Sequence, residues 1–287
     1  MGNSAIVADN LTYHYGKVQA VKGISFEVGA GEVLGFLGPN GAGKSTTVKM
    51  LTGQIKPKSG RALLLGEDVA AHPGRVQAQI GVCFELNNLY ERMSAIENLN
   101  LFASLYGVKG FDANVLLERV NLAGRGKDRV EGYSKGMKQR LMIARALVNQ
   151  PRILFLDEPT DGLDPVSAES IRNLILEERD KGTTVFLTTH DMLEADKLSD
   201  RVGFIEDGEI AVLDTPHNLK QKYGKRALKV ELEGANGRLE TREIVMDGHD
   251  TSAQLQTLFA SEKVVTVHSE EATLEDIFIE LTGRGLL

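Results

Sequence analysis

The sequence predicts an α/β fold built on a parallel sheet, and three observations support this fold class. A short apolar run, residues 33–37, leads directly into a glycine-rich loop that is followed by a helical stretch. Residues 153–156 and 184–187 are continuous apolar runs, as expected for strands that are buried on both faces. After Pro216 the pattern starts again, which predicts a second, smaller α/β unit.

The first residues predict antiparallel β structure ahead of the parallel sheet. Residues 5–15 and 18–28 are apolar stretches on either side of a Gly-Lys turn at residues 16–17. The helix after the glycine-rich loop covers roughly residues 45–51. Further strands are predicted at residues 61–65, 80–84, 202–206 and 209–214. The last two flank an Asp-Gly pair at residues 207–208, which is a strong signal for a two-residue hairpin.

Residues 87–150 have a different character and predict a mostly helical insertion within the α/β domain. Ser94 and Glu97 form a capping box, and apolar residues follow it at helical spacing. A second helical stretch opens at residues 111–112, and a third covers residues 134–148. The helical subdomain therefore divides the strands of the larger domain in the sequence.

The last part of the chain predicts a separate unit with the order ββαβα. Apolar and polar residues alternate in its strands, as in a sheet with one solvated face. The predicted strands are residues 228–232, 239–245 and 264–267, with a turn at residues 234–237 between the first two. The predicted helices are residues 251–260 and a last one that is capped by the sequence Thr-Leu-Glu-Asp at residues 273–276. We place the larger domain at residues 1–219 and the smaller one at residues 220–287.

Composition and charge limit the class of protein. The chain has 287 residues, of which 42% are apolar and 25% charged, as in soluble globular proteins. Its unbroken apolar runs are far shorter than the ~18 residues that suggest a membrane span. The first residues lack the features of a secretory signal. The single cysteine, Cys83, fits a reducing compartment, and its place in the apolar run at residues 80–84 predicts a buried side chain rather than a reactive thiol. The net charge of −7 gives no electrostatic reason to expect nucleic acid as a partner.

The glycine-rich loop, residues 38–45, fits the phosphate-binding pattern G-x-x-x-x-G-K-[ST] at every fixed position. Glycines let successive backbone N–H groups turn inward and form an anion nest at a helix N-terminus. Lys44 is expected to reach the β- and γ-phosphates, and the Ser45 hydroxyl is expected to bind magnesium. The predicted nucleotide-binding residues of this loop are Gly38, Pro39, Asn40, Gly41, Ala42, Gly43, Lys44, Ser45 and Thr46.

Two adjacent acidic residues follow the apolar run at residues 153–156. Asp157 ends the predicted strand and therefore projects at the carboxyl edge of the sheet, where open α/β folds place their ligands. We expect Asp157 to hold magnesium and Glu158 to point elsewhere, because side chains alternate along a strand. Two solvated acids ahead of Pro159 are the structural alternative, but an adjacent pair after four apolar residues favours catalysis.

Three further motifs complete an ordered set along the chain. They are Tyr-Ser-Lys-Gly-Met at residues 133–137, Gly-Leu-Asp at residues 162–164 and Thr-Thr-His at residues 188–190. Together with the phosphate loop and the acidic pair, they resemble the ATP-binding subunit of an ATP-binding cassette (ABC) transporter over most of the first ~220 residues. The resemblance implies a phosphate-loop ABC cassette, in which a RecA-like core carries an antiparallel β part and a helical subdomain. It also implies ATP and Mg²⁺ as ligands.

The resemblance also assigns roles to individual residues. Glu158 would polarise the attacking water, and His190 would contact the γ-phosphate as the switch histidine. Asp164 matches the loop that communicates across a pair of cassettes. Tyr15 matches the aromatic residue that stacks on adenine, although Tyr13 lies two residues away on the same face and could serve instead.

The motif at residues 133–137 occupies the place of the ABC signature, whose usual form is LSGGQ. Only Ser134 and Gly136 match that form, and the Ser-Lys-Gly variant resembles a subgroup that exports drugs, ions or polymers. In this family the signature of one subunit closes over ATP that is held by another, which implies a second ATP-binding subunit. The signature residues are Ser134, Lys135, Gly136 and Met137.

The chain departs from the family after the strand at residues 80–84. Family members carry a glutamine there as a magnesium ligand, whereas this chain has Glu85, whose carboxylate can also ligate magnesium. The alternative is that Glu85 is solvated and that Asn87 or Asn88 supplies the carbonyl oxygen. The predicted metal ligands are Ser45, Glu85 and Asp157.

The resemblance implies a MgATP-hydrolysing subunit that dimerises around ATP, as a homodimer or a heterodimer, and drives a separate transmembrane permease. Its place would be the cytoplasmic face of a bacterial cell membrane, held there through the permease, and its direction export. Residues 220–287 resemble the C-terminal unit of bacterial exporter ATPases, including those for daunorubicin-type drugs and sodium, and predict an accessory or regulatory domain.

Two other classes of protein compete with the exporter. The first is a non-transport ABC ATPase that acts on a macromolecular assembly. The chain lacks the long coiled coil of chromosome-maintenance types and the second cassette of translation types. The second is another phosphate-loop enzyme, such as a GTPase or a small-molecule kinase. No Asn-Lys-x-Asp sequence for guanine occurs, and a kinase would not explain Ser134 or His190.

Overall fold

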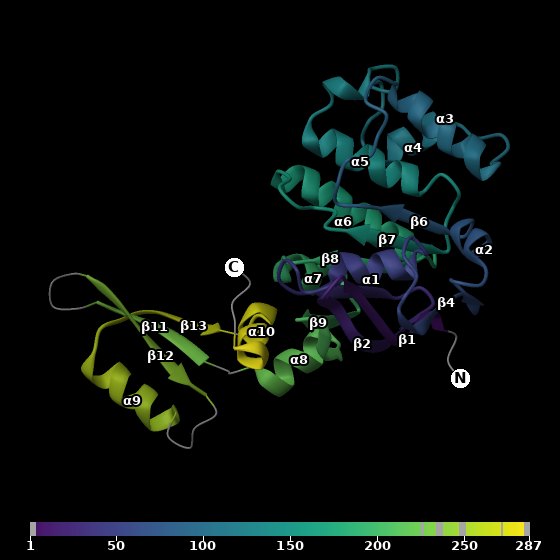
Figure 1. Cartoon of the computed structure of the whole chain (residues 1–287). Helices are drawn as coiled ribbons and strands as arrows, with labels where there is room; N and C mark the ends of the chain where they lie inside the picture. The colour runs from purple at the N-terminus through teal and green to yellow at the C-terminus, as the bar shows by residue number, and fades with distance from the viewer. Residues whose placement is uncertain (1–3, 225–226, 234–237, 247–250, 271, 284–287) are drawn as a thin grey trace. The chain divides into compact units, whose positions relative to one another are not determined.

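The computed structural model describes residues 4–224, 227–233, 238–246, 251–270 and 272–283 (Figure 1). Contacts between Cα atoms divide the chain into a larger unit that ends at Asp214 and a smaller unit, Thr215–Gly285. The boundary predicted from the sequence, between residues 219 and 220, falls inside helix α8 (Pro216–Tyr223), which belongs to the smaller unit.

The larger unit begins with an antiparallel sheet of strand order β2-β1-β4-β5. Its strands are β1 (Ser4–Tyr15), β2 (Val18–Gly29), β4 (Ser59–Leu64) and β5 (Glu67–Asp68). The first two form the predicted hairpin around Gly16, whose φ of +58° suits a residue without a side chain. Helix α2 (Pro73–Gln77) follows this sheet in the chain.

The main sheet of the larger unit has the strand order β10-β9-β3-β8-β7-β6. All neighbouring pairs are parallel except β9 and β10, which form the hairpin predicted at residues 207–208. Its strands are β3 (Val33–Leu37), β6 (Ile80–Cys83), β7 (Ile153–Asp157), β8 (Thr184–Thr189), β9 (Arg201–Glu206) and β10 (Glu209–Asp214). Asp207 and Gly208 have φ values of +46° and +82°, as a two-residue hairpin of the favoured type requires.

The helical insertion lies between β6 and β7 in the chain and forms the upper part of the larger unit in Figure 1. Its elements are α3 (Ala95–Tyr106), α4 (Ala113–Arg119), the short 3₁₀ helix η1 (Val130–Gly132) and α5 (Lys135–Ala146). The capping box predicted for the first helix is present, because Ser94 Oγ accepts from Glu97 N while Glu97 Oε2 accepts from Ser94 N. Local sequence signals thus determine where these helices begin.

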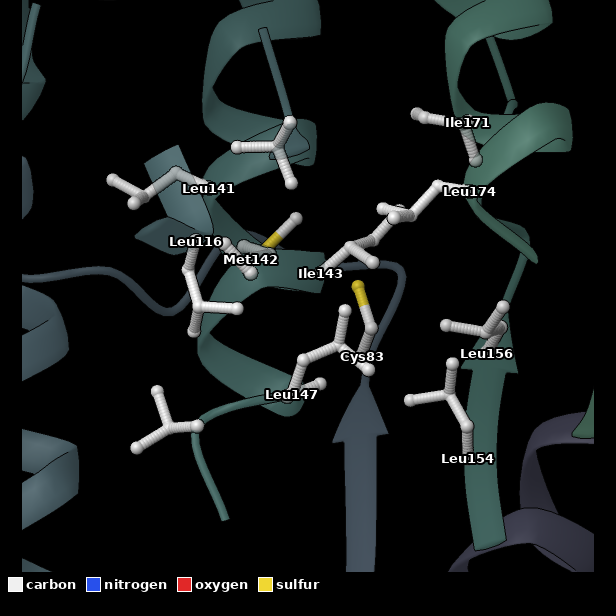
Figure 2. Close-up of a cluster of buried hydrophobic side chains, with 14 of the residues drawn as sticks. Cys83, Leu116, Leu141, Met142, Ile143, Leu147, Leu154, Leu156, Ile171 and Leu174 are labelled. Atoms are coloured by element: carbon white, nitrogen blue, oxygen red, sulfur yellow. The ribbon is translucent and has the colours of Figure 1, made fainter. Parts of the chain in front are cut away.

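Two apolar cores use opposite faces of the main sheet. Leu154 and Leu156 of β7 face the core that includes the helical insertion and α6 (Pro165–Asp180), as Figure 2 shows. Their neighbours Ile153 and Phe155 face the other core, which includes the antiparallel sheet and α1 (Lys44–Leu51). This arrangement explains why β7 is apolar at successive positions, as predicted for a strand buried on both faces.

Cys83 lies in the first of these cores, among leucine and methionine side chains (Figure 2). Burial raises the pKa of its thiol to about 12. Gln139 Nε2 lies 3.7 Å from the sulfur atom and donates to it. The prediction that Cys83 is a buried, unreactive side chain agrees with this environment.

Besides the short helix α2, two helices of the larger unit were not predicted from the sequence: α6 and α7 (Met192–Leu198). Each begins at an aspartate whose side chain accepts from backbone N–H groups of the first turn, Asp164 for α6 and Asp191 for α7. Asp164 belongs to the Gly-Leu-Asp motif and Asp191 follows the Thr-Thr-His motif, and the sequence reasoning assigned neither residue a capping role.

The smaller unit contains a sheet of order β12-β11-β13 and the helices α8, α9 and α10. Its apolar core includes Val230, Leu232, Ile244 and Leu258. The remaining elements are β11 (Ala227–Glu233), β12 (Leu239–Val245), α9 (Thr251–Ser261), β13 (Val264–Glu270) and α10 (Leu274–Thr282). The order after α8 is ββαβα, and Thr273 and Asp276 form the capping box of α10. The predicted turn at residues 234–237 lies outside the described residues.

Among the described residues, no helix combines the length and the apolar character needed to cross a membrane.

Candidate functional site

The phosphate loop connects β3 to α1 at the carboxyl edge of the main sheet. Two of its glycines are required by close backbone contacts. A Cβ atom on Gly38 would overlap Ile205 O, and a Cβ atom on Gly43, where φ is +111°, would lie 2.6 Å from Ala20 O. The loop borders a cavity of about 220 Å³, which is lined by Pro39, Asn40, Gly41, Gly43, Lys44, Ser45, Thr46, Glu85 and Glu158.

Lys44 is the basic residue in the lining of this cavity, and it is only 5% exposed. Its Nζ atom donates to Gly38 O at 2.6 Å and lies 3.2 Å from Glu158 Oε1. A buried ammonium group needs such partners, because desolvation of an unpaired charge is costly. Gly38 O and the Glu158 carboxylate thus hold the Lys44 ammonium group beside the loop. The oxygens of a bound phosphate group could replace both partners.

Asp157 ends β7, as predicted, and is buried beside the phosphate loop. Its Oδ1 atom accepts from Thr188 Oγ1 and, at 3.3 Å, from Ser45 Oγ. A carboxylate and a hydroxyl are oxygen donors of the kind that Mg²⁺ prefers. Within the described ranges, no cluster of three His, Cys, Asp or Glu side chains forms a complete metal cage. This sparse donor set fits Mg²⁺, which keeps several waters and phosphate oxygens as ligands.

Glu158 is turned away from Asp157, but not for the reason given by the sequence argument. The alternation of side chains along a strand does not apply, because β7 ends at Asp157 and Glu158 has a left-handed backbone with a φ of +51°. This turn brings Glu158 Oε2 to 3.0 Å from His190 Nδ1 and 3.3 Å from His190 N. Strained backbone of this kind is concentrated at functional sites.

Oε1 of Glu158 makes no hydrogen bond within the part of the chain that the structure describes, although it is buried. Its neighbour Lys44 Nζ is close enough for an ion pair but is not aligned for a hydrogen bond. A buried carboxylate oxygen without a donor is costly, and such an atom is a candidate for chemical use. Oε1 therefore has free capacity to accept a proton at the edge of the phosphate-loop cavity.

The segment after β6 places Glu85, rather than Asn87 or Asn88, at the phosphate loop. Glu85 lines the loop cavity, whereas Asn87 is engaged with Glu91 Oε1 and Leu89 N. Asn88 is held by its backbone and side-chain oxygens, which both accept from the Arg145 guanidinium. The geometry favours Glu85 of the three candidates, and its role as a magnesium ligand stays a prediction.

The two candidate adenine-stacking residues lie side by side at the end of β1. The rings of Tyr13 and Tyr15 meet edge to face, with centroids 4.9 Å apart. Tyr15 is 48% exposed, whereas Tyr13 is half-buried and has Lys58 Nζ at 5.6 Å from its ring centroid. Tyr15 has the freer face for stacking, and neither ring lines the cavity of the phosphate loop.

The signature residues lie at the start of α5. Ser134 caps this helix by accepting from Met137 N at 3.3 Å. Lys135 is exposed and its Nζ atom lies 3.5 Å from Asp161 Oδ2. Gly136 packs closely on the first turn of α6, since a Cβ atom there would lie 2.8 Å from Ser167 Oγ.

Asp164 caps α6, where its Oδ1 atom accepts from Val166 N and Ser167 N. Hydrogen bonds from the side chain and backbone of Ser167 lower the pKa of this carboxyl group. Sequence reasoning assigned Asp164 only to communication between cassettes, and the structure adds this local role. Its communication role stays a prediction.

Sequence reasoning assigned no role to two polar residues of the site. Thr188, at the end of β8, donates to Asp157, and Asp161 lies 4.0 Å from His190 Nε2 through its Oδ1 atom. Thr188 is the first residue of the Thr-Thr-His motif, and Asp161 directly precedes the Gly-Leu-Asp motif, which was the available signal. A larger cavity of about 660 Å³ lies elsewhere in this unit, near Arg152 and Thr184 at the starts of β7 and β8, and contains none of the predicted site residues.

Comparisons with known proteins identify the class. The "ABC transporter" family model matches residues 21–161. A fluoroquinolones export ATP-binding protein of Mycobacterium tuberculosis is 46% identical over 100% of this chain and 96% of its own length. A daunorubicin resistance ATP-binding protein of Streptomyces coeruleorubidus is 35% identical over 99% and 97%. The dimeric ATP-binding cassette MJ0796, solved with ADP and Pi, is 27% identical over 73% of this chain and 98% of that one, with a TM-score of 0.68.

The chain therefore belongs to the family of ABC transporter ATP-binding proteins. Its fold is the phosphate-loop cassette that the sequence predicted, and it is an ATPase of the type that powers transport. The predicted resemblance to exporter ATPases of the daunorubicin-resistance type is confirmed.

Proposed function

We propose that this chain is the ATP-hydrolysing cassette of a bacterial exporter and that it works as one of a pair attached to a separate transmembrane permease. The observation that carries this proposal is a pair of contacts made by Glu158 beside the phosphate loop. Glu158 Oε1 lies 3.2 Å from Lys44 Nζ, and Glu158 Oε2 lies 3.0 Å from His190 Nδ1. The names of the fluoroquinolones and daunorubicin relatives support export as the direction and amphipathic drugs as the class of cargo.

ATP would enter with its phosphates against the backbone N–H groups of the phosphate loop. Lys44 Nζ then donates to phosphate oxygens in place of Gly38 O, and its ion pair with Glu158 loosens. Glu158 is thereby freed to accept a proton from water as the water oxygen attacks the γ-phosphorus and ADP leaves. His190, held 3.0 Å from Glu158, orients this carboxylate and stands next to the transferred phosphoryl group.

Ser45, Asp157 and Glu85 would hold Mg²⁺, together with phosphate oxygens and water. The ion, when bound, neutralises charge on the β- and γ-phosphates. The contribution of the chain is to keep these donors in place. Thr188 donates to Asp157 and so orients its carboxylate, while Ser45 is fixed in the first turn of α1. Tyr15 offers an exposed ring to the adenine base.

A second cassette would cover the nucleotide with its own signature residues, 134–137, and Asp164 would contribute to the contact between the two chains. The dimeric MJ0796 cassette supports this arrangement. Association with a permease would place the chain at the cytoplasmic face of the membrane. In this arrangement the smaller unit, Thr215–Gly285, is an accessory domain.

Transport in inside-out membrane vesicles tests the proposal. Vesicles that contain this chain and its permease should accumulate a fluoroquinolone when ATP and Mg²⁺ are supplied, and the Lys44→Ala variant should abolish accumulation. Lys49→Ala is the matched control, since Lys49 lies on the same helix, beyond the loop cavity. ATP hydrolysis without any ATP-driven transport by wild-type vesicles would favour the non-transport class of ABC ATPase.

A further inference from the structure

The larger unit has a second cavity, of about 660 Å³, at the edge of the main sheet opposite the phosphate loop. The phosphate loop lies at the carboxyl ends of the parallel strands, whereas this cavity is lined by residues at the starts of β7 and β8, including Arg152 and Thr184. Arg152 precedes β7 and Asp157 ends it, and an extended segment of this length covers about 16 Å. The cavity is therefore separate from the nucleotide site, and its volume is typical of sites for drug-sized molecules.

The apolar part of the cavity lining comes mainly from the helical insertion. Leu116 of α4 and Leu147, just after α5, belong to the apolar core of Figure 2 and line the cavity from there. Val115 of α4 is 56% exposed, and Val108 and Phe111 lie in the segment between α3 and α4. Contact of these side chains with an apolar ligand would remove them from water, which is favourable.

Basic side chains outnumber acidic ones in the lining, by four to two, and both acidic groups are already engaged. Asp112 caps α4 by accepting from Asn114 N. Glu178 is buried and accepts from the Arg119 guanidinium and, at 3.2 Å, from Lys181 Nζ. This cluster joins the end of α4 to the end of α6, so that part of the cavity keeps its shape without a ligand.

Lys109 and Arg152 are the basic residues of the lining without an acidic partner. Within the described ranges, neither side chain makes a hydrogen bond or an ion pair. Arg119 also has an unused donor, because its buried Nε atom has no acceptor in the part of the chain that the structure describes. Single exposed cations are ordinarily solvated, but two that border one apolar cavity complement a molecule with an apolar body and an anionic head.

We propose that this cavity binds a small amphipathic organic anion. The apolar body would lie against Phe111 and Val115, and Lys109 and Arg152 would attract the anionic head. Because the lining comes from both the helical insertion and the main sheet, the bound molecule would link these two parts of the larger unit. The inference does not depend on transport or on the pairing of cassettes.

Decanoate and 2-naphthoate are suitable probes, because they share a carboxylate and differ in their apolar body, a flexible chain or a planar ring. Each is titrated into the ¹⁵N-labelled full chain and followed by amide NMR. We expect saturable shifts at residues 109–112 and 181–184, but not at residues 38–45, with a dissociation constant below about 1 mM for at least one probe. The neutral analogues, decanol and 2-naphthamide, should bind at least about fivefold more weakly.

Variants of exposed side chains test the charges and the apolar wall separately. Lys109→Ala and Arg152→Ala should each weaken binding of the anion about five- to tenfold. Arg92→Ala and Lys127→Ala are the matched controls, since both residues are exposed, belong to the helical insertion and do not line the cavity. Val115→Asp puts a negative charge on the apolar wall and should abolish binding, whereas Val115→Leu should retain it. An unchanged affinity for ATP verifies that each variant is folded.

Three results would overturn this assignment. The first is the absence of saturable binding of both probes up to about 10 mM. The second is equal binding of the anions and their neutral analogues, which would leave no role for the basic residues. The third is an unchanged affinity in Lys109→Ala and Arg152→Ala, which would place the probe elsewhere. None of these results affects the proposed function, which the transport assay with Lys44→Ala tests separately.

Discussion

The larger unit of the chain buries charged side chains, whereas the ion pairs that the structure describes in the smaller unit join exposed side chains. Lys44 and Asp157 are buried at the phosphate loop, and the Glu158 side chain is only 8% exposed. In the smaller unit, the pairs Arg242–Glu262 and Lys263–Glu233 join side chains that are at least 37% exposed. Buried charges are costly, so their concentration in one unit indicates where the chemistry takes place.

The two units also differ in their apolar cores. The cores of the larger unit involve both faces of the main sheet, and they fix the strand ends that carry Asp157 and His190. The core beneath the sheet of the smaller unit is centred on Val230, Leu232, Ile244 and Leu258. We therefore expect changes in the smaller unit to alter its own stability and changes in the larger unit to alter ATP turnover.

Leu258→Ala should give the largest difference between the effects of one substitution on the two units. Removing this buried side chain should destabilise the smaller unit by about 2–4 kcal/mol and leave the affinity for ATP unchanged. Hydrogen exchange of the amides of β11 with and without ATP measures the first effect, and ATP titration measures the second. Phe259→Ala is the matched control, because Phe259 is the next residue of α9 and is 56% exposed. A parallel loss of ATP affinity in Leu258→Ala would show that the units are not independent.

Substitution of Glu85 should have a smaller effect, a change in the Mg²⁺ requirement of the ATPase activity of the larger unit. Glu85→Ala should raise the Mg²⁺ concentration for half-maximal ATPase about tenfold, because an oxygen ligand is lost, while Glu85→Gln stays active. The measurement is ATPase rate against Mg²⁺ with the permease present. Asn87→Ala is the control, since Asn87 is tied to Glu91 outside the loop cavity. If Asn87→Ala raises the Mg²⁺ requirement and Glu85→Ala does not, the ligand lies further along the segment.

A shortened chain that ends at Asp214 tests whether the larger unit folds and binds ATP without the smaller unit, and the expected change in ATP affinity is smaller still. The main sheet already closes at the hairpin of β9 and β10, so the larger unit should remain folded without the smaller one. We expect its dissociation constant for ATP to stay within about threefold of wild type. Isothermal titration calorimetry with ATP and Mg²⁺ measures this dissociation constant. Insolubility or loss of nucleotide binding in the shortened chain would contradict the division into two domains.

For Cys83 we expect almost no reaction with thiol reagents as long as the protein is folded. Because burial raises the pKa of its thiol to about 12, the folded protein should react very slowly with thiol reagents from pH 7 to pH 9. In the unfolded chain the thiol regains its ordinary pKa of 9.0 and should react fully. The unfolded state therefore loses this proton first as pH rises through 9, so this thiol contributes a decrease in stability above pH 9. Rapid labelling of the native protein at pH 8 would contradict its placement in the core.

The sequence predicted those parts of the site that depend on local signals. The phosphate loop, the strand end at Asp157 and the hairpin at residues 207–208 all follow from residue types at fixed spacing. The capping boxes of α3 and α10 were predicted in the same way.

What the sequence did not reveal depends on contacts between distant residues. Thr188 reaches Asp157 only because β7 and β8 are neighbours in the sheet. Glu158 adopts a left-handed backbone that no propensity favours for glutamate, and its bonds to His190 accompany that conformation. Asp161 has no motif of its own, and only the fold brings it near Lys135 of α5 and His190.

The most direct test of the central claim is the Glu158→Gln variant, measured for turnover and for association in the same preparation. Glutamine keeps the shape of the side chain but cannot accept the proton, so turnover should fall by about 10²–10⁴-fold while ATP still binds. The ATP that is not hydrolysed should hold two chains together, and light scattering should detect a dimer that requires ATP and Mg²⁺. Turnover within about twofold of wild type would contradict the assignment of Glu158 as the base.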